Sequence, residues 1–199
     1  MTWNRRTTLA GLLALIGLPA RAAIPTPGQT EGPFYPRPSM RFADIDNDLV
    51  KIAGVVRQAG GEVVHLTGRV LDREGAPVSD ARVEIWQCDV NGRYMHTGDR
   101  GGAPRDPAFQ GFGHDVTDDQ GRYRFRTIKP VVYPGRTPHI HVKVLTGDMT
   151  LTTQFYLDGD PDNARDVLWR RLSKAERAAV AMVFRLVDGV PTTEVDIRL

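Results

Sequence analysis

The segment from Tyr133 to His141 contains the side chains of this chain that are best suited to hold a metal ion. His139 and His141 are separated by one residue, and because side chains alternate along a strand they would point to the same face of a sheet. Imidazole is the most common protein metal ligand near neutral pH. Tyr133 precedes them across a Pro-Gly bend, which can fold the phenol back toward the same point. Two imidazoles and one phenol therefore form a candidate site.

A second tyrosine, Tyr94, adds another hard donor. It ends the turn-like segment 89–94. Phenolate oxygen is a hard anionic donor that suits iron(III), and ligand hardness is one way in which protein sites discriminate between metals. Zinc or copper chemistry at the two histidines is an alternative, which the tyrosines disfavour because zinc sites use mainly His, Cys and carboxylate ligands.

Each of these residues also has an ordinary interpretation when it is taken alone. Tyr94 could be a surface aromatic, and Tyr133 could be a packing residue at the end of a strand. His139 and His141 could be one core residue and one hydrogen-bonding residue. The metal hypothesis depends on the four side chains meeting at one point.

The composition is that of an ordinary globular domain. The length of 199 residues fits about one domain, the formal net charge is +2, and the basic residues are scattered along the chain. We therefore expect no nucleic-acid partner and no attraction to an anionic membrane. The single cysteine, Cys88, excludes an internal disulfide, and we expect it to be a small buried side chain.

The first 23 residues have the features of an export signal. Arg5 and Arg6 form a twin-arginine pair, residues 9–18 form a short apolar core, and residues 20–22 resemble a cleavage site. This pattern predicts a periplasmic or secreted protein with no stable membrane anchoring after the signal is removed. A helix that packs on the domain is the structural alternative.

The rest of the chain predicts a mostly β fold. Residues 24–60 are rich in proline and predict an irregular arm that packs on the domain, and residues 61–199 predict a β-sandwich domain that contains the candidate metal ligands. Long irregular loops, above all residues 89–115, are expected to carry the site. Alternating apolar and polar residues predict strands at 63–71, 81–88, 122–128, 139–145 and 151–157, with short final strands at 184–187 and 195–199.

One C-terminal helix is predicted within residues 164–184. Ser173 is suited to its N-cap, and Glu176 stands three residues later, as a capping box requires. Val180 and Phe184 continue one apolar face.

Four motifs in sequence order carry a family resemblance. They are residues 31–35, 86–94, 133–141 and 153–161. Together the motifs resemble the intradiol ring-cleavage dioxygenases, the family that includes protocatechuate 3,4-dioxygenase and catechol 1,2-dioxygenase. The likeness covers roughly residues 26–163.

The resemblance implies a non-haem iron(III) enzyme that uses O2 to cleave a catechol-type ring between its two hydroxyl-bearing carbons. It implies four protein ligands to the iron, which are Tyr94, Tyr133, His139 and His141. Tyr133 matches the axial tyrosine, which leaves the metal when a catecholate binds.

Three further roles come from the same resemblance. Arg136 matches an arginine that stabilises negative charge on the bound substrate. Gln154 matches a polar residue that faces the site, and Tyr35 matches a residue that closes over the pocket. Among the other histidines, His96 and His114 are expected to be loop hydrogen-bonding or pocket-rim residues.

A non-enzymatic, transthyretin-like β-sandwich binding module is the main alternative, because such modules share the pattern of residues 68–90. A binding module has no need of two tyrosines and two histidines at one point. The sequence leaves open whether the substrate is a carboxylate-bearing ring, a plain catechol or a hydroxyquinol. A homo-oligomer is possible, but no segment specifies one.

Overall fold

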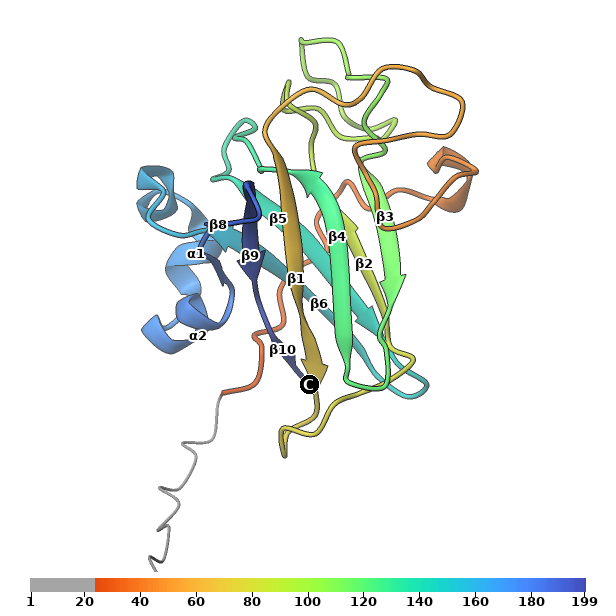
Figure 1. Ribbon diagram of the computed structural model, residues 1–199. Helices are drawn as coiled ribbons and strands as arrows, with labels where there is room; N and C mark the ends of the chain where they lie inside the picture. Colours follow the sequence, from red (N-terminus) through yellow and green to blue (C-terminus); the bar gives the residue numbers. More distant parts are fainter. Residues whose placement is uncertain (1–23) are drawn as a thin grey trace, which may run out of the picture.

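Two β-sheets form the body of the molecule (Figure 1). The computed structural model describes residues 24–199, so the predicted export signal at 1–23 lies outside the described residues. The first sheet contains β1 (Val63–Leu71), β4 (Arg122–Ile128), β8 (Arg185–Val187), β9 (Val190–Glu194) and β10 (Ile197–Arg198). The second sheet contains β2 (Arg82–Trp86), β3 (Phe112–Val116), β5 (His139–Leu145), β6 (Thr150–Leu157) and β7 (Ala181–Met182). This arrangement confirms the predicted mostly β sandwich.

The main apolar core lies between the two sheets. Ile140 and Val142 of β5 are fully buried and belong to the same cluster as Leu66 of β1 and Phe125 of β4. Since successive side chains of a strand point to opposite faces, the odd-numbered residues of β5 must point away from this core. The two histidines of β5 therefore lie on the outer face of the second sheet.

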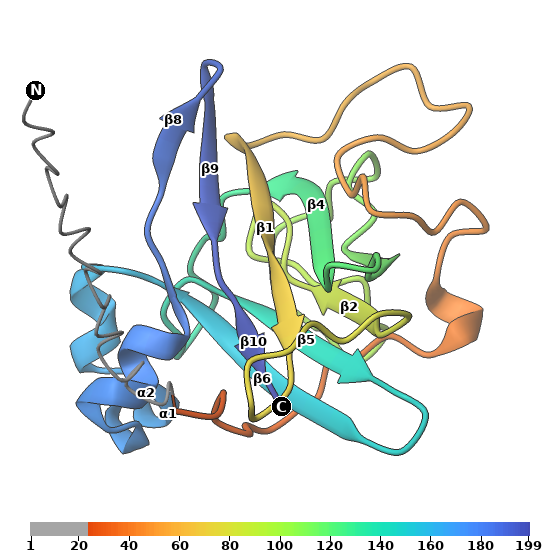
Figure 2. The same ribbon diagram turned by 60° about the horizontal axis from the view of Figure 1, so that its bottom comes forward.

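The N-terminal arm covers that outer face. Figure 2 shows residues 24–40 following the side of the second sheet that faces away from β1 and β4. The arm is irregular apart from the 3-10 turn η1 (Pro38–Met40). It is tied to β6 where the Gln29 amide donates to the Thr152 carbonyl (2.7 Å) and the Gln29 side chain donates to Thr153 Oγ1 (3.1 Å). A second, smaller apolar cluster forms beneath the arm around Trp86 and Tyr94.

The prediction of one C-terminal helix within residues 164–184 is wrong, because the segment forms several short helices. The segment forms η2 (Pro161–Ala164), α1 (Val167–Arg171) and α2 (Lys174–Ala179), followed by β7 and β8. The helix is split because Asp166 caps α1 and Ser173 caps α2, so that each begins a separate helix. The Ser173–Glu176 capping box is present. None of the helices in residues 24–199 is both long and apolar enough to cross a bilayer.

The predicted loop 89–115 ends earlier than expected. Residues from Phe112 onward form β3, which pairs antiparallel with β2, with Phe112 opposite Trp86. The sequence hides this strand because Gly113 and Asp115 have low strand propensity. Gly113 is required there, since a Cβ would come within 2.5 Å of the Asp46 carbonyl oxygen. The short strand β9 was also not predicted.

At Gly68 the first sheet has no room for a larger side chain. A Cβ at this position would lie 2.0 Å from the Val195 carbonyl oxygen and 2.8 Å from the Tyr123 hydroxyl, which donates a 2.5 Å hydrogen bond to the same carbonyl. We predict that Gly68→Ala lowers the free energy of unfolding by about 1–3 kcal/mol, as overpacking does. Urea unfolding measures this. In the control Gly147→Ala no heavy atom lies within 4 Å of the new Cβ, and a change of less than about 0.5 kcal/mol is expected.

Candidate metal centre

The strand register of the second sheet sets the position of both histidines. His141 of β5 lies opposite Trp86 of β2 and Gln154 of β6, while His139 lies opposite Tyr156 of β6. The Trp86 ring stacks on the His141 ring, with centroids 4.7 Å apart and planes 9° from parallel. Both imidazoles are buried, at 1% and 2% exposure. The outer face of this sheet therefore presents two enclosed, oriented nitrogen donors.

A tight turn brings Tyr133 to the histidines, as the sequence predicts. The Arg136 amide donates to the Tyr133 carbonyl (3.0 Å), and Gly135 has a φ of 83°. Proline at the second position and a positive-φ glycine at the third are typical of a type II turn. The centroid of the Tyr133 ring lies 5.5 Å from that of His139.

The loop after β2 delivers Tyr94 to the same place. Asp89 anchors this loop, because its Oδ1 accepts from the amides of Asn91 (2.8 Å) and Arg93 (3.0 Å). The Tyr94 amide donates to Asp99 Oδ2 (2.6 Å). The Tyr94 ring is only 3% exposed.

Three of the four predicted ligands have donor atoms in close contact. His139 Nε2 lies 3.1 Å from His141 Nε2 and 3.4 Å from the Tyr94 hydroxyl oxygen. The ring centroids of Tyr94 and Tyr133 are 5.2 Å apart, which places the fourth predicted ligand, Tyr133, beside the other three. Distances of about 3 Å are those of donors that each lie about 2 Å from a common ion. The structure thus brings together the four side chains predicted from the sequence.

The protonation states of the two histidines suit metal binding. His139 Nδ1 is 2.7 Å from the Thr137 carbonyl oxygen. Because a carbonyl can only accept, Nδ1 carries the proton and Nε2 keeps its lone pair. Burial, assisted by the positive charge of Arg136, lowers the pKa of His139 to about 3. Burial and the neighbouring His139 lower the pKa of His141 well below its ordinary value. Both rings are neutral at physiological pH, as ligation requires.

The donor set fits a hard trivalent cation better than zinc. Burial raises the pKa of Tyr94 well above 10 and also raises that of Tyr133, so both phenols stay protonated unless a strong Lewis acid is bound. Nδ1 of His141 is buried with no hydrogen-bond partner. In residues 24–199 no group of three or more His, Cys, Asp or Glu is arranged to hold a metal. A metal held at this point therefore needs tyrosine oxygen among its ligands.

Arg136 and Gln154 form one hydrogen-bonded unit beside the histidines. Arg136 Nη2 donates to Gln154 Oε1 (2.6 Å), and Arg136 Nη1 lies 3.4 Å from His139 Nε2. Gln154 Nε2 donates to the Thr30 carbonyl (3.0 Å), which links the arm to the unit. Arg136 Nε donates to the buried carboxylate of Asp166 (2.6 Å). A guanidinium is thus held next to the donor cluster.

Tyr35 of the arm packs against Trp86 of β2. Its hydroxyl donates to Glu84 Oε2 (2.6 Å), and its ring packs edge-on against Trp86 at 4.9 Å, one layer behind His141. The arm residue that lies on the tyrosines is Phe34, whose ring stacks on Tyr94 at 4.8 Å. Tyr35 thus supports the stack from behind, and Phe34 occupies the covering position.

His96 and His114 are not among the clustered donors, although the His96 ring lies 5.8 Å from the ring of Phe34, which packs on Tyr94. His96 Nδ1 accepts from the Gly98 amide (3.0 Å) within the loop, as expected for a loop hydrogen-bonding residue. His114 lies on β3 opposite Glu84 and not in a loop. Cys88 is buried at 1% exposure, as predicted.

Sequence reasoning missed Phe34, Asp166 and the role of Trp86. A signal existed for Asp166, because it immediately precedes a helical segment as an N-cap does. The stacking of Trp86 on His141 follows from cross-strand register, which one strand's sequence does not reveal.

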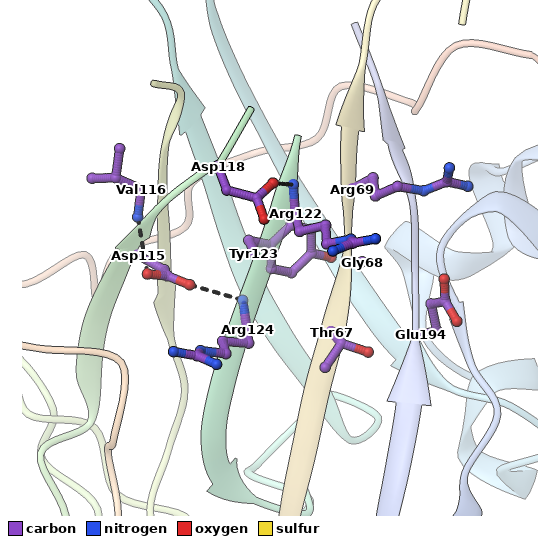
Figure 3. A pocket seen from close by; sticks show the side chains of 10 residues that line it. All are labelled: Thr67, Gly68, Arg69, Asp115, Val116, Asp118, Arg122, Tyr123, Arg124 and Glu194. Carbon is purple, nitrogen blue, oxygen red and sulfur yellow. Dashed lines mark hydrogen bonds between the residues drawn. The ribbon is translucent and has the colours of Figure 1, made fainter. Parts of the chain in front are cut away.

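Cavities adjoin the donor cluster but do not identify it. A cavity of about 330 Å³ is lined by Tyr133, Arg136 and Asp166 and also by Val132 and Arg165. A larger cavity, of about 650 Å³, lies elsewhere, on the outer face of the first sheet (Figure 3). Its lining includes Asp118, Arg122 and Arg124, with charges of both signs and none of the four donors. Donor chemistry therefore locates the candidate site better than cavity size.

Comparison with known proteins adds independent information. Residues 30–195 match the family model described as Dioxygenase (Dioxygenase_C). The chain is 43% identical over 152 residues to the protocatechuate 3,4-dioxygenase beta chain of Burkholderia cepacia, which covers 71% of this chain and 64% of that one. It is 35% identical over 150 residues to the hydroxyquinol 1,2-dioxygenase of Corynebacterium glutamicum, covering 65% of this chain and 45% of that one. The chain thus spans less than two thirds of these relatives.

A solved structure agrees with these matches. It is the dioxygenase domain of a dioxygenase carbohydrate-binding protein fusion from the cellulolytic bacterium Streptomyces sp. SirexAA-E. The TM-score is 0.69 at 32% identity, over 88% of this chain and 98% of that chain.

The buried histidines predict a pH dependence for the metal-free protein. The folded-state pKa of His139 is about 3, against about 6.5 in the unfolded chain, so the unfolded state takes up the proton first. The stability that comes from the neutral ring is present above about pH 6.5 and is lost as the pH falls toward the folded pKa. In this pH range, each such histidine lowers the free energy of unfolding by up to about 1.4 kcal/mol for every pH unit by which the pH falls.

Urea unfolding of metal-free protein between about pH 7.5 and about pH 5.5 measures this loss, in a range where ordinary carboxylates stay ionised. The double variant His139→Gln/His141→Gln should show a shallower slope. His114, whose pKa is also lowered by burial, accounts for part of the remaining slope. An unchanged slope in the double variant would contradict the assignment.

Proposed function

The chain belongs to the intradiol ring-cleavage dioxygenase family, and we propose that it is a non-haem iron(III) enzyme that cleaves a catechol. Family members use non-haem iron(III) and bind catechol substrates and O2. In the proposed reaction both atoms of O2 enter between the two hydroxyl-bearing carbons and give a cis,cis-muconate-type product. The observation that carries the proposal is the meeting of two neutral imidazoles and two phenols at one buried point.

Tyr94, Tyr133, His139 and His141 are the proposed iron ligands. The ferric ion would act as a Lewis acid and as a template for the catechol, and would overcome the spin barrier to reaction with O2. The two phenolates would offset much of the ferric charge, which favours activation of the bound catechol over its simple oxidation.

The two tyrosines differ in a way that suits different roles. Tyr94 is enclosed, stacked under Phe34 and held by its loop. Tyr133 is half-buried and borders the cavity beside Arg136. A catechol must lose two protons to bind through both oxygens, and the Tyr133 oxygen can accept one of them when it leaves the metal. Tyr133 is therefore the ligand that we propose a bound catechol would displace.

Arg136 is the proposed electrostatic group for the substrate. Its guanidinium lies beside His139 with a fixed orientation, and a preorganised cation stabilises negative charge that develops on a bound ring. Gln154 fixes one edge of that guanidinium and is proposed to act through it. Tyr35 is proposed to support the Trp86–His141 stack from the arm.

The two alternatives explain the site less well. A binding module has no need of two imidazole nitrogens 3.1 Å apart and a phenol oxygen 3.4 Å from one of them at a buried point. A zinc hydrolase lacks a third His, Cys or carboxylate ligand among residues 24–199. A periplasmic or secreted location stays a prediction, and so does assembly as a homo-oligomer.

Iron reconstitution with a substrate panel tests the proposal. Protein with one ferric ion per chain should be burgundy-red, from tyrosinate-to-iron(III) charge transfer. Oxygen uptake with 3,4-dihydroxybenzoate, catechol and hydroxyquinol should equal substrate consumed, and the product spectra should be those of muconates. Fully loaded but colourless protein would rule the proposal out.

Tyr133→Phe separates iron ligation from packing. The variant keeps the ring but loses the oxygen, so the colour should shift or bleach and kcat/KM should fall about 10²-fold or more. Visible spectra at matched iron content and oxygen uptake measure both effects. Tyr123→Phe is the control, because Tyr123 is a buried core residue bonded to Val195 and is remote from the donors. Equal colour and rate in wild type and Tyr133→Phe would refute the ligand assignment.

A further inference from the structure

Asp166 is a buried carboxylate with two separate sets of partners. Its side chain is fully buried. Oδ1 accepts from the amides of Leu168 (2.9 Å) and Trp169 (3.0 Å), which makes Asp166 the N-cap of α1. Oδ2 accepts from Arg136 Nε (2.6 Å) and from the Thr137 amide (3.2 Å). One carboxylate oxygen thus accepts hydrogen bonds from the first turn of α1, and the other accepts them from the segment that precedes His139.

The carboxylate stays charged in this position. Burial alone would raise the pKa of Asp166, but the Trp169 amide and the Arg136 guanidinium act against burial, and the net pKa lies below the ordinary value. Arg136 has a side-chain exposure of 16%, so the ion pair is largely shielded from water. Shielded, charge-assisted hydrogen bonds of this length are among the strong ones.

The bond to Nε determines where the rest of the guanidinium can point. Because the guanidinium is planar, fixing Nε on Asp166 and Nη2 on Gln154 leaves one orientation for Nη1. Nη1 then lies 3.4 Å from His139 Nε2, at the donor cluster. Gln154 is an amide that also bonds to Thr30 and Tyr156. Asp166 is the charged partner that holds the opposite edge.

We propose that Asp166 is a positioning residue, whose carboxylate orients Arg136 toward the substrate and docks α1 against the segment that precedes His139. The inference rests on the proposed function for its effect on substrate. Its structural part, the orientation of Arg136, is independent of that function.

Asp166→Asn tests the proposal without removing the helix cap. Asparagine keeps an oxygen for the Leu168 and Trp169 amides and is as good an N-cap as aspartate, but it loses the charge and one of the two acceptors. In metal-free protein we expect solvent exchange of the Arg136 Nε–H proton to quicken about tenfold or more. NMR measures this exchange, and the resonance is identified by its absence from Arg136→Lys.

In iron-loaded protein we expect Asp166→Asn to raise KM for the catechol about tenfold or more, as loss of a charged hydrogen bond does. Exchange that stays at the wild-type rate would overturn the proposal. A lower KM would also overturn the proposal. It would mean that Asp166 only weakens the attraction of the Arg136 charge for the substrate and does not orient the guanidinium. Faster exchange of the Arg136 Nε–H proton with an unchanged KM would overturn the claim that the orientation of Arg136 affects substrate binding.

Two further variants keep the test decisive. Ser173→Ala removes the cap of α2, which lies away from Arg136, and should leave both the Nε–H exchange and KM at wild-type values. If Asp166→Asn does not fold, Asp166→Ser offers another N-cap residue without the ion pair. If wild-type protein cleaves no catechol, the proposed function fails, while the exchange measurement in metal-free protein still decides the role of Asp166.

Discussion

The burial of metal-donor side chains on the outer face of a sheet is the constraint on which the rest of this structure depends. Imidazoles and phenols that point away from the sandwich core would normally face water. Here His139 and His141 are almost inaccessible, and Gly32 of the arm lies against the His141 ring. Enclosure keeps the rings neutral, because burial lowers the pKa of both histidines. The arm is therefore needed for the chemistry as well as for the stability of the second sheet.

Enclosure also explains the layered aromatic packing at this face. His141 is sandwiched between Trp86 and the arm, and a Cβ on Gly32 would come within 3.3 Å of its ring. Tyr35 packs behind Trp86, and Phe34 covers Tyr94. A donor ring that is packed between neighbours on both faces has little freedom to rotate. The donor atoms are therefore held near their positions without a metal.

The parts of the site that sequence could predict are those fixed by local rules. Strand alternation placed His139 and His141 on one face, and the Pro-Gly turn returned Tyr133 to them. The parts that it could not predict depend on contacts between distant segments. The pairing of Trp86 with His141 depends on register between β2 and β5, and the strand β3 depends on pairing that overrides weak local propensity. The prediction of a single helix failed because α1 ends at Arg171 and Ser173 caps a second helix, α2.

The same strand therefore serves the core with one face and the candidate site with the other. Ile140 and Val142 anchor β5 in the main core, while His139 and His141 face outward from the same backbone. A shift of β5 by one residue would move the apolar side chains to the arm and the imidazoles into the core. The apolar pattern thus excludes any shift by an odd number of residues, because such a shift would bury the donors in the core. The burial that folds the sandwich therefore also fixes the face on which the candidate metal site lies.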